Sequence, residues 1–600
     1  MSAPAPRAAR IYCNLPKAVR SEPQASGVEK VASEHAKTRS AEGRTASGSL
    51  SRVVADTGTR TSRRALLAIC AVAAVLRLAH LREIAANDPF YTLPEVDGRL
   101  YDAWARRILE GLPLDDGVLF LGPLYAYFMA LVYALLDATP AAVKVVQCGL
   151  GVVVVALVAV VAREVFDRRV ALLAASIAAL YEMLIFYGGT LMVVNVQVPL
   201  VLLVVWLSLR ALRRPTALRW LAAGLVCGLS ALARQTALLF APLVVGWLLV
   251  SQRGRLPGRA LAGCAAAFVL ALALPILPFT LQNYRASGDF VLLNSTGGAN
   301  LYMGNNAYSD GTWLPPRIGR RIDHPVAMRD AFTRTARERT GRELRPSEVS
   351  AYWAGEALAF VVEHPAHWLA LELRKLLLFV NAREVWNVRA IEVERDFSWV
   401  LRLPLLRYGV VAPFGLLGLG LAARRWRELL PLYAMLAAYL AAALIFFVLA
   451  RYRMPSVPLL FVFAAFTAVW LFDAARARAW RRLAGSLAAL IVLAGVVHLP
   501  LGEGSLHMAH FNLGNKYMAL SRWDEAIASF GRAIAIRPSF LSSYNNLALT
   551  FEGARRREDA ITTWQWVLAR ALEQGDEVRA ARARRHLRAL GVEPEPPPGS

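Results

Sequence analysis

The sequence predicts an all-α fold, in which a polytopic bundle of membrane-spanning helices is followed by a small domain of repeated helices. Of the 600 residues, 56% are hydrophobic, and many of these lie in uninterrupted apolar blocks. A block of about 18 residues or more is long enough to cross a bilayer as a helix. Near the C-terminus, two similar stretches start at Asn512 and Asn546. A sequence repeat with the interval that separates these two residues is typical of stacked helix pairs.

The chain begins with a polar tail. Residues 1–60 are rich in Ala, Ser and Arg and show no hydrophobic periodicity, which predicts a disordered N-terminal segment. The predicted membrane domain covers residues 61–500 and contains about eleven spans. We place these spans at 64–83, 140–162, 170–187, 190–212, 217–233, 236–250, 258–281, 404–422, 429–449, 456–472 and 483–499.

The apolar block 119–136 decides the topology. If this block lies in the membrane surface, the basic clusters of the short loops, such as 210–214 and 424–427, fall on the same side as the N-terminus. Cytoplasmic loops carry the excess of Lys and Arg, so we expect 119–136 not to span and the N-terminus to be cytoplasmic. The segments 84–139 and 284–400 and the C-terminal repeats then share the outer face.

The same basic clusters explain the formal net charge of +24. Their position between apolar blocks is typical of cytoplasmic loops, so nucleic acid is not an expected partner. Four of the five cysteines fall inside apolar blocks and none forms a CxxC pair. We therefore predict neither a disulfide nor a metal site.

A carboxylate, Asp97, follows the first span at the start of "DGRLYDAWARRILEG". The apolar residues of this stretch recur at helical spacing, and Gly111 is a typical helix stop. Asp97 is therefore a candidate N-cap of a surface helix. A carboxylate at the membrane boundary is also well placed to take a proton from an acceptor hydroxyl or amine as a general base. The sequence leaves both interpretations open.

Three arginines stand at predicted outer boundaries of the membrane. Arg451 and Arg453 flank Tyr452 in "ARYRMPSVP", where the positive-inside rule disfavours basic residues, and Arg234 in "LSALARQT" is similarly placed. They either snorkel to lipid headgroups or hold a phosphate, which is the preferred bidentate partner of a guanidinium.

The stretch "NSTGGANLYMGNNAYSDGTWLPP", residues 294–316, is rich in Gly and Asn and contains aromatic side chains. Such a stretch is expected to be a loop with many amide hydrogen-bonding groups. It is either a plain structural loop or a surface for a sugar or acceptor. In the second case the candidate residues are Asn305, Asn306, Asp310 and Trp313.

The C-terminal repeat carries the tetratricopeptide signature of paired helices, because Leu, aromatic and Ala positions of the two stretches coincide. We expect residues 505–592 to form a tetratricopeptide domain that ends in a basic capping helix. Such domains bind a protein or peptide partner through a concave face. A separate module of this kind is expected to serve partner recruitment more than the basic activity.

In chain order, these features resemble the GT-C membrane glycosyltransferases of the protein O-mannosyltransferase and aminoarabinose transferase type. The resemblance covers 64–500. It rests on an acid in the first outer loop, followed by "GPLYAYFMALVY", "YEMLIFYGG", "ALARQTALLFAP", "YMGNNAYSDGTW" and "ARYRMPSVP". It implies a polyprenyl-phosphate-linked sugar as donor and inversion of the anomeric carbon. It also implies Asp97 as base, with Arg451 and Arg453 holding the donor phosphate.

The chain departs from this family at one point, since the usual Asp-Glu pair reads Asp97-Gly98. A second acid is therefore sought in Asp102 or Glu95. Glu182 is a further candidate near the outer end of its predicted helix. An ionisable residue in a membrane segment is a functional-site hypothesis by default.

The expected function is that of a multi-pass transferase in a bacterial inner membrane. It moves a sugar from a polyprenyl-phosphate donor to an acceptor on the outer face and has membrane lipid and a protein as partners. No nucleotide-sugar motif is recognised and no cofactor is expected, which suits a lipid-linked donor. The alternative is a non-catalytic membrane scaffold that displays the repeats. A transporter is disfavoured because paired internal repeats are not recognised.

Overall fold

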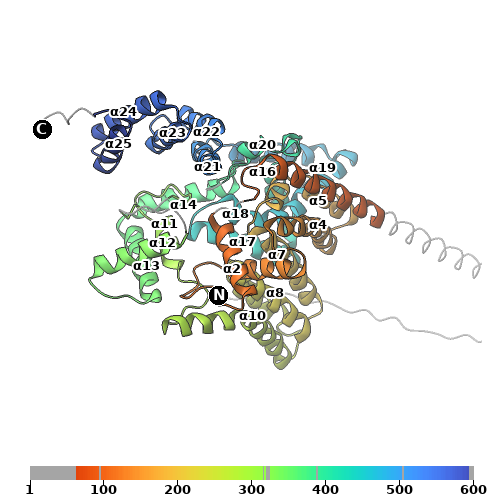
Figure 1. Ribbon diagram of the computed structural model, residues 1–600. Coiled ribbons are helices and arrows are strands. Elements are labelled where there is room, and N and C mark those ends of the chain that lie inside the picture. The colour runs from red at the N-terminus through yellow and green to blue at the C-terminus, as the bar shows by residue number, and fades with distance from the viewer. Residues whose placement is uncertain are drawn as a thin grey trace, which may run out of the picture. The chain divides into compact units, whose positions relative to one another are not determined.

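Helices are the regular elements of this chain (Figure 1). The structure is a computed structural model that describes residues 62–92, 96–314, 317–318, 325–386, 389–502 and 506–593. Within these residues, β-type pairing is limited to three isolated bridges. The predicted all-α class is therefore confirmed, whereas the tail 1–60 lies outside the described residues.

Seven helices of the described residues are long and apolar enough to cross a membrane. Five of them are Ser62–Asn87, α4 (Pro140–Val165), α7 (Val194–Arg213), α10 (Gly258–Ser287) and α20 (Trp480–Val497). The sixth, Ala423–Ile445, includes α17 (Trp426–Ile445). The seventh, Ala450–Arg476, includes α18 (Ala450–Arg453) and α19 (Val457–Arg476). Three further predicted spans are shorter apolar helices, namely α8 (Ala217–Ala233), α9 (Ala237–Gln252) and α16 (Tyr408–Leu421).

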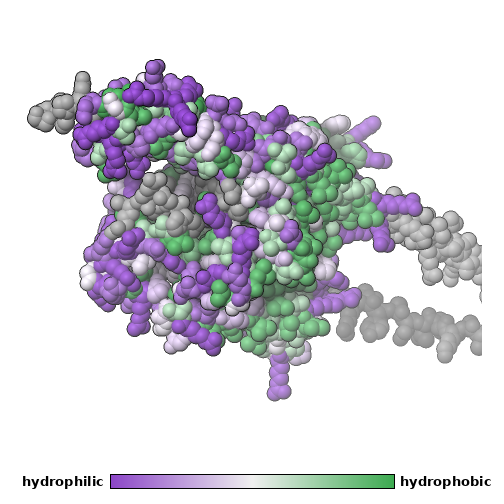
Figure 2. Space-filling model, viewed as in Figure 1, coloured by the Kyte–Doolittle hydropathy of each residue, from purple (hydrophilic) through white to green (hydrophobic). Residues whose placement is uncertain are grey.

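The outer surface of these helices is apolar. Leu270 and Leu274 on α10 are 70% and 63% exposed, and Ile491 on α20 is 72% exposed. Figure 2 shows hydrophobic residues gathered over the long apolar helices, whereas α12, α13 and the C-terminal helices are mainly hydrophilic. An apolar surface of this extent marks a membrane or protein contact, and on helices of spanning length it indicates lipid.

The predicted span 170–187 is interrupted. The chain forms α5 (Arg168–Leu180) and α6 (Glu182–Gly188), which are separated at Tyr181. Tyr181 has extended backbone angles, and its neighbours pair with Leu406: Glu182 N donates to Leu406 O at 3.0 Å, and Leu406 N donates to Leu180 O at 3.0 Å. The break arises because these backbone groups bond to a distant segment instead of continuing the helix.

The segment after the first helix contains two helices, as the sequence predicts. They are α2 (Val96–Leu109) and α3 (Leu124–Leu135). At 12 residues, α3 is about 18 Å long, well short of the roughly 30 Å of a bilayer core. Gly122 precedes it, and a Cβ atom there would lie 2.4 Å from the Leu232 carbonyl oxygen at the end of α8. The glycine thus allows this turn to pack directly on the backbone beside Arg234.

The long loop between α10 and α16 is itself helical. It contains α11 (Gly297–Gly304), α12 (Pro325–Thr340), α13 (Pro346–Glu363), α14 (Pro365–Val380), α15 (Ile391–Glu394) and a 3-10 turn at Trp399–Arg402. The Gly- and Asn-rich stretch expected as a loop therefore includes α11. A Cβ atom at Gly304 would lie 1.8 Å from the Phe446 carbonyl oxygen. The glycine thus lets the end of α11 approach the end of α17.

The C-terminal domain consists of α21 (Leu506–Ala519), α22 (Trp523–Ile536), α23 (Leu541–Gly553), α24 (Arg557–Glu573) and α25 (Glu577–Ala589). The positions that coincide in the two stretches form the cores of the helix pairs: Ala526 and Phe530 are fully buried, and so are Ala560 and Trp564. The domain thus consists of two helical hairpins, α21–α22 and α23–α24, and a final basic helix, α25, as the sequence predicts.

Candidate functional site

A cavity of about 840 Å³ brings the predicted donor and base residues together. Its wall is formed by the start of α2, the connection from α8 to α9, the start of α11, the end of α17 with α18, and α21. Asp97, Arg234, Arg451, Tyr452 and Arg453 all line it. These residues are separated by up to several hundred positions in the sequence, so only the fold joins them.

Asp97 and Arg451 form an ion pair in this wall. Arg451 Nη1 donates to Asp97 Oδ2 at 2.5 Å. The side chain of Arg451 is 12% exposed and that of Asp97 is 17% exposed. α2 begins at Val96, so Asp97 lies in its first turn and not at the N-cap position expected from the sequence. An acid in the first turn still interacts favourably with the helix dipole, but its side chain is directed at Arg451.

Arg234 is the C-cap residue of α8 and lies against Tyr452. The centre of its guanidinium is 3.8 Å from the centroid of the Tyr452 ring, a distance at which a cation is attracted by the ring face. The Nε atoms of Arg234 and of Arg451 are buried and have no hydrogen-bond partner among the described residues. Two guanidinium groups thus line one cavity, and each has a buried Nε–H group without an acceptor among the described residues.

Arg453 has a different environment, although it also lines the cavity. Its side chain is 2% exposed, Nη1 donates to the carbonyl oxygens of Phe379 and Asn381, and Nη2 donates to Glu384 at 2.8 Å. These bonds hold the end of α14 and the following loop against the first turn of the Ala450–Arg476 helix. The predicted contact of Arg453 with a donor phosphate stays a prediction, and Glu384 is a partner that the sequence did not indicate.

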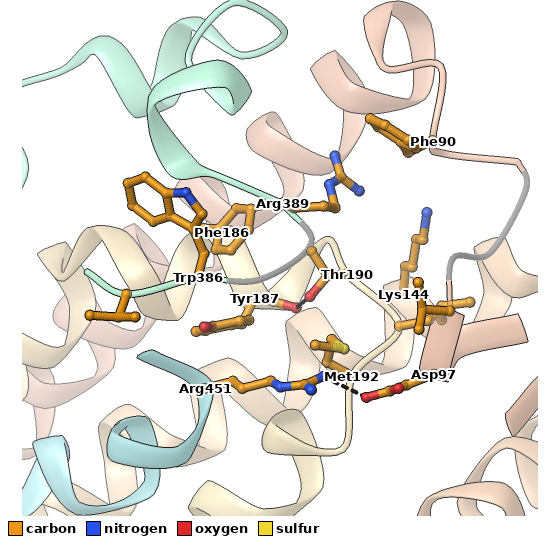
Figure 3. A pocket seen from close by; sticks show the side chains of 13 residues that line it. Phe90, Asp97, Lys144, Phe186, Tyr187, Thr190, Met192, Trp386, Arg389 and Arg451 are labelled. Carbon is orange, nitrogen blue, oxygen red and sulfur yellow. Dashed lines mark hydrogen bonds and ion pairs between the residues drawn. The ribbon is translucent and has the colours of Figure 1, made fainter. Parts of the chain in front are cut away.

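A second, smaller cavity of about 70 Å³ adjoins the Asp97–Arg451 pair. Figure 3 shows this pair on one side, and Lys144 and Arg389 extending toward Phe90. Lys144 Nζ donates to the Tyr91 carbonyl oxygen at 2.7 Å. Neither cation was singled out from the sequence. Lys144 could have been found, because it is an ionisable residue near the start of an apolar block.

The other candidate acids lie apart from this cavity or are not described. Asp102 accepts from the Tyr133 hydroxyl at 2.5 Å and from Arg106 at 3.1 Å, and thereby joins α2 to α3. Glu182 is 4% exposed and pairs with Arg395 at 2.9 Å. Neither side chain lines either cavity. Glu95 lies outside the described residues.

Of the four candidates for a sugar or acceptor, Trp313 lines the large cavity. Asn305 is buried, donates to the Ile445 carbonyl oxygen at 2.9 Å and accepts from Lys375 at 3.0 Å. Asn306 donates to Tyr302 at 2.7 Å, and Asp310 accepts from the backbone and hydroxyl of Thr312. These three polar side chains hold the segment itself in place, and their role toward a ligand stays a prediction.

Tyr101 adds a neutral polar group beside Asp97. It is 3% exposed, lines the large cavity and packs edge-to-face on Tyr125. Burial, reinforced by the negative charge of Asp97, raises the pKa of the Tyr101 phenol above its ordinary value. The phenol therefore stays protonated at neutral pH and can donate a hydrogen bond but not accept a proton as a base.

Among the described residues, no group of three His, Cys, Asp or Glu side chains is placed to hold a metal ion.

Helices and repeats together define the class: an all-α polytopic membrane protein that carries a C-terminal tetratricopeptide domain. Residues 121–279 match the family model of the dolichyl-phosphate-mannose-protein mannosyltransferases, and residues 514–553 match the tetratricopeptide repeat. The predicted resemblance to GT-C membrane glycosyltransferases is thereby confirmed over residues 121–279, and the predicted tetratricopeptide repeat over residues 514–553. None of the curated proteins matches the sequence.

Solved structures of two membrane proteins are similar to this chain. One is the archaeal oligosaccharyltransferase AglB from Archaeoglobus fulgidus, in complex with an inhibitory peptide and a dolichol-phosphate, with 16% identity and a TM-score of 0.41. The match covers 77% of this chain and 59% of the AglB chain. ArnT from Cupriavidus metallidurans, bound to undecaprenyl phosphate, has 14% identity and a TM-score of 0.33. The match covers 68% of this chain and 79% of the ArnT chain. The chain therefore spans less than two thirds of the length of AglB.

Proposed function

We propose that the protein is a membrane glycosyltransferase that moves a sugar from a polyprenyl-phosphate donor to an acceptor on the outer face of the membrane. The observation that carries the proposal is the cavity of about 840 Å³ in which Asp97 pairs with Arg451 and which Arg234 also lines. A cavity of this size is large enough for a whole small-molecule ligand. It combines a carboxylate and two guanidinium groups with a wall of apolar helices.

The donor phosphate is assigned to Arg451 and Arg234. Nη1 of Arg451 is engaged by Asp97, whereas its Nε and the Nε of Arg234 are buried without a partner among the described residues. Buried polar groups are normally hydrogen-bonded, and leaving one without an acceptor is costly. Phosphate oxygens in the cavity supply acceptors for both groups. The polyprenyl chain then follows apolar side chains such as Leu238 and Leu239 of α9, which line the same cavity.

Asp97 is assigned as the general base. The acceptor hydroxyl or amine attacks the anomeric carbon from the face opposite the phosphate, and its proton passes to the Asp97 carboxylate. As the new glycosidic bond forms, the bond from the anomeric carbon to the phosphate oxygen breaks, and polyprenyl phosphate leaves with the electron pair. Arg451 and Arg234 stabilise the negative charge that develops on this leaving group. The direct displacement inverts the anomeric carbon.

Binding of undecaprenyl phosphate to the detergent-solubilised full chain tests the donor assignment. The lipid should raise the thermal unfolding temperature, and the rise should grow with lipid concentration, because a ligand that binds only the folded state stabilises it. Undecaprenol is the matched control, since it has the same chain without the phosphate. An equal rise with undecaprenol, or no rise with either lipid, would contradict the assignment.

Cysteine labelling in intact cells tests the assigned face. In a background without native cysteines, a membrane-impermeant maleimide should label Tyr308→Cys in the exposed outer segment. It should label Arg214→Cys and Arg424→Cys only after lysis, because these exposed residues belong to the basic clusters. Labelling of the two arginine positions in intact cells, with Tyr308→Cys protected, would show the opposite orientation.

A further inference from the structure

One side of the first tetratricopeptide helix, α21, forms part of the wall of the large cavity. The residues of α21 that line it are Met508, Asn512, Asn515, Lys516 and Ala519. These positions recur at the spacing of a single helix face. The transfer cavity is therefore completed by the C-terminal domain, although the sequence suggested a module that serves recruitment more than the basic activity.

A neighbouring side of α21 fixes this helix on the rest of the protein. Leu513 and Tyr517 are buried, and they belong to one hydrophobic cluster with residues that precede the repeats, namely Phe90, Val393 and Phe397. Because this side is packed, the side chains on the cavity side of α21 have a defined position in the cavity wall.

The α21 wall lies at the end of the cavity where Asp97 and Arg451 pair. Lys516 Nζ is 5.5 Å from the centroid of the Phe90 ring. Phe90, like Asp97 and Arg451, lines both the large cavity and the small one that adjoins it. In a polyprenyl-phosphate donor, the phosphate separates the lipid chain from the sugar. With the phosphate on Arg451 and the lipid chain along α9, the wall formed by α21 is available to the sugar.

A hydrogen bond from the second repeat orients the carboxamide of Asn515. Asn546 Nδ2 donates to Asn515 Oδ1 at 2.6 Å, and Asn545 Nδ2 donates to Asn546 Oδ1 at 3.1 Å. Asn545 and Asn546 line neither cavity, so they act from behind the wall. The oxygen of Asn515 is thus engaged, whereas its Nδ2 donates to no other side chain or backbone group of the described residues. Asn515 therefore offers an oriented N–H donor at the cavity wall.

We propose that Asn512 and Asn515 of α21 bind hydroxyl groups of the sugar that is transferred, so that the tetratricopeptide domain takes part in recognition of the donor. A carboxamide carries N–H donors and a C=O acceptor, and a hydroxyl group both donates and accepts. The ring of Phe90 in the same cavity offers an apolar face to the C–H groups of a sugar. This inference rests on the proposed transferase function, and it makes α21 a determinant of donor specificity in addition to any recruitment.

Binding of two lipids to the detergent-solubilised full chain tests the proposal. One lipid is the polyprenyl-phosphate-linked sugar purified from cells that produce Asp97→Asn, and the other is undecaprenyl phosphate. The rise of the unfolding temperature with lipid concentration gives the affinity for each. Asn512→Ala/Asn515→Ala should bind the sugar-bearing lipid about tenfold more weakly than the wild type, because hydrogen bonds to the sugar are lost. Its affinity for undecaprenyl phosphate should be unchanged.

Two further variants complete the comparison. Ala519→Trp adds bulk at an exposed position of the same face of α21, and it should weaken binding of the sugar-bearing lipid more than binding of undecaprenyl phosphate. Gln565→Ala is the matched control, since Gln565 is an exposed carboxamide of the repeats that lines neither cavity. This control should bind both lipids as the wild type does.

Two results would overturn the role of α21. If Asn512→Ala/Asn515→Ala binds the sugar-bearing lipid as tightly as the wild type, α21 does not contact the sugar. If this variant loses affinity for both lipids equally, α21 supports the phosphate site or the fold and does not recognise the sugar. Failure of the proposed function is seen already without these variants, because undecaprenyl phosphate would not stabilise the wild type and no lipid-linked sugar would accumulate with Asp97→Asn. That result would remove this inference as well.

Discussion

Replacement of Asp97 by asparagine should lower sugar transfer by about a hundredfold or more, which is the usual contribution of a general base. Asparagine keeps the shape of the side chain and a carbonyl oxygen that can accept from Arg451, but it cannot take the acceptor proton at neutral pH. Transfer can be measured in membranes as the rate at which the polyprenyl-phosphate-linked sugar is consumed. Binding of undecaprenyl phosphate should persist.

Asp102→Asn is the matched control for this experiment. Asp102 lies on the same helix, but it bonds to Tyr133 and Arg106 and does not line the cavity. Its replacement should leave the transfer rate within about twofold, since it removes no group from the reacting atoms. Full activity of a well-expressed Asp97→Asn protein would remove Asp97 from the catalytic role, and so would an equal loss in the control.

Replacement of Arg451 by alanine should abolish most of the stabilisation by undecaprenyl phosphate and reduce transfer by at least tenfold. A hydrogen bond to a charged group contributes about 1.5–3 kcal/mol, and Arg451 also holds Asp97. Arg234→Ala should weaken lipid binding without loss of the ion pair, which separates the two roles of Arg451. Lipid binding that is unchanged in both variants would place the phosphate elsewhere.

Arg453→Ala serves as the contrasting variant. Its guanidinium is engaged by Glu384 and two backbone carbonyl oxygens, so its loss leaves a buried carboxylate without a partner. Such a change costs about 3–5 kcal/mol. The unfolding temperature without lipid should therefore fall, whereas Arg234→Ala should leave it almost unchanged.

The sequence predicted the elements whose cause is local. The tetratricopeptide helices follow from a repeat period, α2 from helical spacing of apolar residues, and the long spans from apolar length. The break at Tyr181 was not predictable, because it depends on backbone bonds with Leu406 that form only when the fold brings the two segments together. A run of apolar residues looks the same in the sequence whether the helix that it forms is continuous or interrupted.

For the site, sequence reasoning identified residues but not their partners. Asp97 and Arg451 were both candidates, yet their ion pair joins positions that are 354 residues apart. Arg453 was treated as equivalent to Arg451, and only the packing around Glu384 separates the two. The lining of the cavity by α21 was missed, since the repeat signature identifies the faces that build the repeats and not the surface to which they attach.

The most direct test is the measurement of polyprenyl-phosphate-linked sugars by mass spectrometry in cells that produce the wild-type protein, the Asp97→Asn protein or no protein. The proposed transferase predicts that the same lipid-linked sugar accumulates with Asp97→Asn and without the protein, while Asp102→Asn keeps the wild-type level. If the Asp97→Asn protein is present in the membrane at normal amounts and the lipid pool is that of the wild type, the protein is not a transferase that uses Asp97, and a scaffold becomes the better account.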